Sequence, residues 1–335
     1  MNKFLKFGLV SFIVFLLVTP LVAMGAKDAN VTSSYENPKT LHASVLNGPS
    51  GMGMAYLFEH EPDLDGVKCT FETTASPDVL LPKMIKGEID IGILPTNAAA
   101  KIYNANGLVV LGAIVGEGNL YVMSRDKKVH TVADLVGKKI AVAGHGATPD
   151  YLLQYLASKS LIEIGDSDDK INMDFSIPTA EIAPSLIAGK IDYALVPEPF
   201  ATVCQMKDQS ILRSLDLQHL WMAYSDEALN YPLTVCVIRK EYAQKYPQTV
   251  QKFLDEYRKS IEWTNANPLE AGKLVEKYTL GLSAAIASKS IPNASFAYIP
   301  AADAKPFVES LLSVFLQIEP SSIGGKLPDN NFYFK

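Results

Sequence analysis

The chain has 335 residues, of which 48% are hydrophobic and 20% are charged, with 21 glycines and 20 prolines. This composition excludes a disordered, collagen-like or coiled-coil protein, and the length is enough for about two domains that each bury a core. The formal net charge is −6 and no long basic stretch is present, which argues against binding to nucleic acid.

The first 25 residues have the pattern of a secretory signal peptide. Lys3 and Lys6 precede an apolar run from Phe7 to Ala23, and small residues stand at Ala23 and Gly25. Cleavage after Gly25 would place the protein in the periplasm or another extracytoplasmic space, and retention of the segment as a membrane anchor is the alternative. No cysteine lies near the cleavage point, so we do not expect a lipoprotein.

The rest of the chain contains two copies of one pattern. Residues 82–95 and 184–197 align at an offset of 102, with Pro, Ile, Gly, Ile, Asp and Pro at matching positions. Each copy predicts a helix that ends at a glycine, then a tight turn and a buried strand that ends at a proline. The two prolines, Pro95 and Pro197, stop the strands and lead into new helices.

A strand, a glycine-rich turn and a helix precede each copy. The first set is 41–46, 47–51 and 52–59, and the second set is 139–143, 144–149 and 150–159. This alternation predicts an α/β fold with two similar lobes, each a mostly parallel sheet with helices on both faces. Ligands of such sheets bind beyond the carboxyl ends of the strands, so two facing lobes would form one site between them.

Two further strands, 120–124 and 233–238, are expected to join the lobes as hinges. We therefore expect lobe I at residues 38–123 and 234–335, and lobe II at residues 124–233. A contiguous arrangement of two domains is the alternative that the sequence leaves open.

Four segments carry a resemblance to a known family: residues 46–51 (LNGPSG), 94–99 (LPTNAA), 131–142 (TVADLVGKKIAV) and 196–201 (VPEPFA). The series resembles the solute-binding proteins of ABC importers, in the group that includes aliphatic sulfonate, taurine, nitrate and thiamine-precursor binders. The resemblance extends over roughly residues 41 to 270. It implies a type II periplasmic binding protein that closes on a small-molecule ligand and docks on an ABC permease at the membrane.

The two glycine-rich turns are the first candidates for ligand contact. Free backbone N–H groups at a helix start favour a polar or anionic group, and pairing of the two lobes would bring both turns to one ligand. Simple N-capping by Ser50 and Thr148 is the alternative. The candidates are Asn47, Ser50, Gly51 and Met52 in the first turn, and His145, Gly146, Ala147 and Thr148 in the second.

Further candidates follow the two repeat prolines: Thr96 and Asn97 in the first copy and Glu198 in the second. Thr96 could instead cap its helix, and Glu198 could be a solvated first-turn acid. The scarcity of Arg and Lys in these loops disfavours a dianion held by an arginine clamp, and Glu198 with Asp150 favours a neutral or cationic group. The expected ligand classes are a sulfonate, a nitrate-like anion or a thiamine-precursor-like heterocycle.

The sequence predicts a binding protein and no enzyme, with no catalytic residues, metal or cofactor. Cys69, Cys204 and Cys236 form no CxxC pair, and the sequence leaves open whether Cys204 and Cys236 meet. The alternatives are an enzyme of the same fold, similar to a thiamine-pyrimidine synthase or a lyase, and a sensor lobe. We expect a monomer that binds no nucleic acid.

Overall fold

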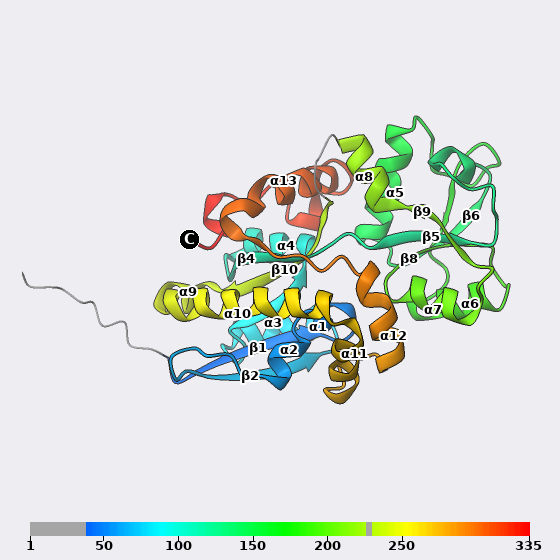
Figure 1. Ribbon diagram of the computed structural model, residues 1–335. Helices are drawn as coiled ribbons and strands as arrows, with labels where there is room; N and C mark the ends of the chain where they lie inside the picture. The colour runs from blue at the N-terminus through cyan, green and yellow to red at the C-terminus, as the bar shows by residue number, and fades with distance from the viewer. Residues whose placement is uncertain (1–37, 226–229) are drawn as a thin grey trace, which may run out of the picture. The chain divides into compact units, whose positions relative to one another are not determined.

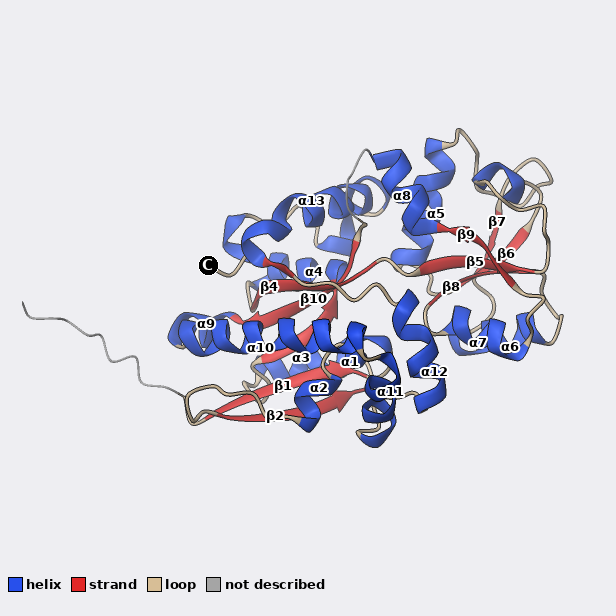
Figure 2. Ribbon diagram, in the orientation of Figure 1, coloured by secondary structure: helices blue, strands red, loops and turns tan. Residues whose placement is uncertain are grey.

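Two β-sheets flanked by helices organise the computed structural model, which describes residues 38–225 and 230–335 (Figures 1 and 2). The expected signal peptide, residues 1–25, lies outside the described residues. Within the described ranges no helix has the length and apolar character needed to cross a bilayer.

Among the described residues, the first sheet has six strands in the order β11-β4-β10-β3-β1-β2. β1 pairs in parallel with β2 and β3, whereas β10 runs antiparallel to β3 and β4. The strands are β1 (Thr40–Leu46), β2 (Lys68–Thr74), β3 (Ile91–Pro95), β4 (Val109–Glu117), β10 (Pro232–Arg239) and β11 (Ile299–Pro300).

Helices cover both faces of this sheet, because alternate residues of its central strands face two different cores. Val235 and Val237 of β10 pack in the core that includes α13, whereas Cys236 and Ile238 pack in the core that includes α10. Figure 1 shows these two helices on opposite sides of β4 and β10. The helices are α1 (Pro49–Met52), α2 (Ala55–Glu59), α3 (Pro77–Ile85), α4 (Thr96–Asn106), α9 (Lys240–Lys245), α10 (Pro247–Ala266), α11 (Pro268–Lys277), α12 (Ala284–Ser290) and α13 (Ala301–Ile318), with short 3-10 turns at Ile291–Asn293, Pro320–Ile323 and Asn330–Phe332.

The second sheet, in the same described part of the chain, has five strands in the order β7-β6-β8-β5-β9. Its strands are β5 (Leu120–Ser124), β6 (Lys139–Val142), β7 (Asn172–Asp174), β8 (Tyr193–Pro197) and β9 (Leu212–Asp216). Its helices are α5 (Thr148–Lys159), α6 (Thr179–Ile187), α7 (Phe200–Lys207) and α8 (Leu217–Ser225), with a 3-10 turn at Val132–Leu135.

The two sheets repeat one arrangement around the predicted pair of strands. β3 lies between parallel β1 and antiparallel β10, and β8 lies between parallel β6 and antiparallel β5. The prediction of two similar α/β lobes is therefore confirmed, and the repeated sequence pattern forms β3 and β8. The expectation of mostly parallel sheets is corrected, because β10 in the first sheet and β5 in the second pair antiparallel with both of their neighbours, so both sheets are mixed.

The crossing from the first sheet to the second lies earlier than the sequence indicated. β5 hydrogen-bonds to β8 and β9, so residues 120–123 belong to the second sheet and not to the first lobe. The crossing falls at Gly118 and Asn119, between β4 and β5. The Gly118 N–H donates to the Tyr231 carbonyl (2.9 Å), and the Asn230 amide donates to the Gly118 carbonyl (2.9 Å). The crossing is thus held against the residues that lead into β10.

Candidate functional site

Two adjoining pockets lie where β1, β3 and β8 end, at the carboxyl ends at which α/β sheets bind ligands. The first pocket has a volume of about 220 Å³ and the second about 310 Å³. Both are lined by Pro95, Pro197, Leu233 and Thr234, so these residues form the boundary between them. Loops of both sheets contribute to this pair of pockets.

The loop after β1 lines the first pocket with Asn47 and Ser50. The Ser50 hydroxyl donates to the Leu46 carbonyl (2.9 Å), so its oxygen remains as an acceptor for a ligand. Ser50 does not cap a helix, and the helix expected at residues 52–59 is divided into α1 and α2. Because α1 has only four residues, its helix dipole is weak, and this turn does not favour an anion as the sequence suggested.

Gly51 and Met52 do not line either pocket. The Met52 side chain is completely buried in the core formed by β1, α10 and α11. Gly51 is buried as well, and a Cβ at this position would lie 3.3 Å from a Val45 methyl group. Both residues are therefore packing residues of the first sheet, which corrects their assignment as ligand contacts.

The loop after β6 lines the second pocket with Ala147 and Thr148. Thr148 is 6% exposed, and its hydroxyl has no hydrogen-bond partner in the part of the chain that the structure describes. Thr148 is the first residue of α5 and not its N-cap, so capping does not explain the hydroxyl. It is a polar group at the pocket wall that a ligand could engage.

His145 and Gly146 face Asp150 and line neither pocket. The Asp150 carboxylate accepts from the Gly146 N–H (2.8 Å) and from Gln154 (2.6 Å), and contacts His145 Nδ1 (3.0 Å). The His145 side chain is 77% exposed and its ring packs on Phe175 with centroids 4.5 Å apart. Asp150 therefore braces the glycine-rich turn, and its carboxylate is satisfied within the protein.

Thr96 and Asn97 differ in their surroundings although they are adjacent. The buried Thr96 hydroxyl donates to the Pro232 carbonyl (2.7 Å), which ties the end of β3 to β10. Asn97 lines the second pocket, and its side-chain amide has no hydrogen-bond partner among the described residues. Only Asn97 of this pair can offer its side chain to a ligand.

Glu198 lines the first pocket but is completely buried and ion-paired with Arg213 of β9. It also accepts a hydrogen bond from the Thr202 N–H (3.2 Å). Burial raises the pKa of Glu198, and the Arg213 guanidinium opposes that rise. Since Glu198 and Asp150 both have partners within the protein, neither supports the expected preference for a neutral or cationic group.

Two residues of the site were missed by the sequence analysis: Glu117, the last residue of β4, and Asn119, in the crossing to β5. Glu117 is half-buried, and burial raises the pKa of its carboxyl to about 7. Asn119 is 5% exposed; its amide nitrogen donates to the Ala294 carbonyl (3.2 Å), and its Oδ1 is buried without a partner among the described residues. Glu117 stands between two glycines, Gly116 and Gly118, in a segment that joins two apolar runs. This pattern is the sequence signal that could have indicated Glu117 and Asn119 as site residues.

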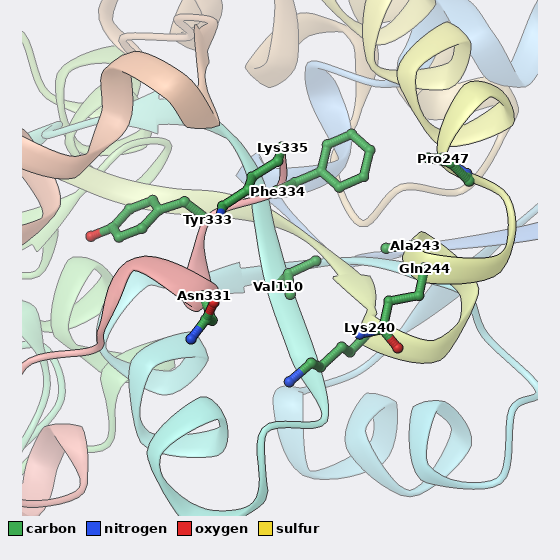
Figure 3. A pocket seen from close by; sticks show the side chains of 9 residues that line it. All are labelled: Val110, Lys240, Ala243, Gln244, Pro247, Asn331, Tyr333, Phe334 and Lys335. Atoms are coloured by element: carbon green, nitrogen blue, oxygen red, sulfur yellow. The ribbon is translucent and has the colours of Figure 1, made fainter.

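A further pocket of about 330 Å³ lies away from these loops, against β4, α9 and the C-terminal residues (Figure 3). Lys240, Tyr333 and Phe334 are among its lining residues, and all its walls belong to the first sheet and its attached segments. A movement of one lobe against the other would not enclose a ligand there, so this pocket is not the candidate site.

A model of the NMT1/THI5-like family matches residues 65–271 of the chain. Among solved structures, an ABC transporter from Parabacteroides distasonis is 28% identical with a TM-score of 0.77, over 89% of this chain and 99% of that chain. The periplasmic aliphatic sulphonate binding protein SsuA from Escherichia coli is 16% identical with a TM-score of 0.70, over 89% and 93%.

The periplasmic nitrate-binding protein NrtA from Synechocystis PCC 6803 is 13% identical with a TM-score of 0.60, over 84% of this chain and 82% of that chain. A search of curated proteins gives no match. These similarities show that the two sheets form the type II periplasmic binding protein fold, as the sequence predicted.

Proposed function

The chain belongs to the NMT1/THI5-like family, and we propose that it is the extracytoplasmic solute-binding protein of an ABC importer. It captures a small organic solute in the two adjoining pockets and delivers it to a membrane permease. The observation that carries this proposal is the lining of the pockets, because Ser50 and Asn97 come from the first sheet and Thr148 from the second. A solute there contacts both sheets at once.

Closure by hinge motion is the mechanism that this arrangement supports. A solute that contacts both lobes favours the closed state by the difference in its affinity for the closed and open states. The lobes proposed for this motion are those of the sequence analysis with both boundaries moved. The first moves from residue 123 to the Gly118–Asn119 crossing, and the second moves from residue 233 to the start of β10 at Pro232. The permease then recognises the closed form.

The similarity to proteins described as periplasmic supports export of this chain to the same kind of compartment. The solutes named for those proteins, an aliphatic sulphonate and nitrate, are starting candidates alongside a thiamine-precursor-like heterocycle. The fold similarity does not choose among them, because the identities of 16% and 13% are too low to transfer a ligand.

The enzyme alternative gains no support from the described part of the chain. The residues that line the two pockets include no cysteine and no histidine. Cys69, Cys204 and Cys236 are free and buried, which also answers whether Cys204 and Cys236 pair. Burial raises the pKa of Cys204 to about 11 and that of Cys69 to about 12, so both thiols stay protonated and are poor nucleophiles at neutral pH.

The decisive test is release of cargo. The purified protein is unfolded, and the small molecules that it releases are identified by mass spectrometry. The refolded protein is then titrated with these molecules while small-angle scattering measures its radius of gyration. We expect one tightly bound solute and a smaller radius on binding. Absence of both a retained solute and any ligand-induced compaction would overturn the proposal.

A matched pair of variants tests the residues. Thr148→Val removes only the hydroxyl at the second pocket and should weaken binding of the released solute about tenfold, the value of one hydrogen bond. The control is Thr179→Val, at an exposed position of α6 outside both pockets. Equal affinity of the two variants would remove Thr148 from the site.

A further inference from the structure

We propose that the site selects solutes that carry a cationic nitrogen group, an ammonium or an amidinium, held between the Glu117 carboxylate and the Asn119 side-chain carbonyl. The inference rests on the proposed function and narrows its ligand class. It assigns recognition to residues of the β4–β5 crossing that no sequence motif indicated.

The placement of Glu117 is fixed by its backbone. It pairs with Pro232 of β10, and its N–H donates to the Ser295 carbonyl (2.9 Å) on the other side. Held between these two segments, the residue lines the first pocket. Its carboxylate makes no hydrogen bond or ion pair within the described ranges of the chain.

The charge around Glu117 is not compensated. The residues that line the two pockets include no Lys, Arg or His, and the one other ionisable residue among them is Glu198. Glu198 has its own partner in Arg213. The pockets therefore present one unpaired carboxylate, which attracts a cation and repels a sulfonate or nitrate in a partly desolvated site.

Asn119 lines the same pocket, and its buried Oδ1 is a second acceptor without a partner among the described residues. Because its Nδ2 donates to the Ala294 carbonyl, the amide orientation is set and Oδ1 must be the free atom. A buried acceptor without a partner costs free energy in the empty site, and an N–H donor of the solute would recover it. Two acceptors without a hydrogen-bond partner among the described residues match a group that carries several N–H bonds.

The raised pKa of Glu117, about 7, agrees with this geometry. Burial disfavours the ionised carboxyl in the empty site, and a cation bound beside it would favour that form again. Apolar side chains of the first pocket, Leu46, Leu94, Leu233 and Phe296, offer surface for the carbon body of the solute. The solute predicted here is thus an apolar body with a cationic nitrogen at one end.

The test uses the full-length protein freed of cargo and matched solutes that differ only in the polar group. The solutes are benzylamine, benzamidine, benzyl alcohol and benzenesulfonate, and calorimetry measures their affinities at pH 6 and pH 8. We expect the two cations to bind more tightly than the alcohol and the sulfonate. Their affinities should rise roughly tenfold between the two pH values, because Glu117 ionises in that range.

Glu117→Gln keeps the shape and removes the charge, so it should weaken binding of both cations about tenfold or more and abolish the pH dependence. The control is Glu262→Gln, at an exposed position of α10, which makes the same change in net charge away from the pockets. Asn119→Ala should weaken the cations without removing the pH dependence, and circular dichroism confirms that each variant is folded.

The outcomes separate this inference from the proposed function. Preference for benzenesulfonate, or equal binding by the Glu117→Gln variant and the wild-type protein, overturns the inference and leaves a solute-binding protein of another specificity. The same holds if none of the four probes binds, or if the cargo released on unfolding has no basic nitrogen. Absence of cargo together with absence of compaction overturns both.

Discussion

The guanidinium of Arg213 forms an ion pair with the completely buried carboxylate of Glu198. Arg213 also donates to the Thr202 hydroxyl (3.0 Å) and lies over the Tyr121 ring, 5.0 Å from its centroid. These contacts join β9 to the loop after β8 and to β5. Arg213 is therefore engaged within the second sheet.

Arg213→Met should destabilise the protein in a pH-dependent way. Without the guanidinium, burial raises the pKa of Glu198 further and only the contacts with Thr202 oppose the rise, so the folded state holds a proton that the unfolded chain releases above its ordinary pKa. The free energy of unfolding should fall by about 3–5 kcal/mol at pH 8 and by less at pH 5. Urea denaturation at the two pH values measures the difference.

The double variant Arg213→Met/Glu198→Leu is the matched control. It removes both charges together, so most of the lost stability should return, since a well-packed apolar pair can replace a buried ion pair. A loss that is equal at both pH values, or a double variant no more stable than the single one, would contradict the role given to this pair.

The architecture could be predicted from the sequence because its signals are local and repeated. Residues 82–95 and 184–197 each contain a complete helix, turn and strand, and the structure places β3 and β8 in equivalent positions of the two sheets. The position of β5 could not be predicted in the same way. A short apolar strand has the same pattern in either sheet, and only its pairing with β8 and β9 decides between them.

The site was predicted less well because contacts between distant residues determine it. Ser50 and Thr148 were found from the glycine-rich turns and Asn97 from the repeat proline before it, and all three line the pockets. Glu198 was found without its partner Arg213. Asn119 owes its orientation to Ala294, which is 175 residues away in the sequence. No local pattern indicates that such a residue ends beside a ligand pocket with one acceptor unpaired.

Gly118→Ala should disturb the crossing between the sheets. A Cβ at Gly118 would lie 2.1 Å from the ring of Tyr231, which is completely buried and donates to Gln218 (3.0 Å). Gln218 also accepts from the Leu120 N–H (2.7 Å), so the ring cannot move without disturbing the start of β5. We expect a loss of about 2–3 kcal/mol in the free energy of unfolding, as for overpacking of a core.

Gly53→Ala is the control for this change. The nearest atom to a Cβ at Gly53, on Ile261, is 3.4 Å away, and this glycine has an ordinary helical conformation. The free energy of unfolding of the Gly53→Ala variant should stay within about 0.5 kcal/mol of the wild-type value. If the two variants unfold at the same urea concentration, the close packing of Gly118 on Tyr231 does not constrain the crossing.

The unfavourable environment of Glu117 predicts that its removal stabilises the empty protein. Burial raises the pKa of this carboxyl from an ordinary value of 4.5 to about 7. Between these values the folded state binds more protons than the unfolded chain, so the free energy of unfolding falls as the pH rises through this window and stays low above it. Glu117→Gln removes this dependence because glutamine does not titrate.

The variant should therefore match the wild-type protein near pH 4 and be more stable at pH 8, by about 1–3 kcal/mol, since solvent that reaches the half-buried carboxyl screens part of the effect. Urea denaturation at pH 4, 6 and 8 checks the trend, and Glu262→Gln should show none. A stability difference that does not change with pH would contradict the assignment.

A residue whose replacement stabilises the empty protein and weakens the binding of a cation serves binding and not folding. A saturating concentration of a cationic solute should therefore stabilise the wild-type protein more than the Glu117→Gln variant.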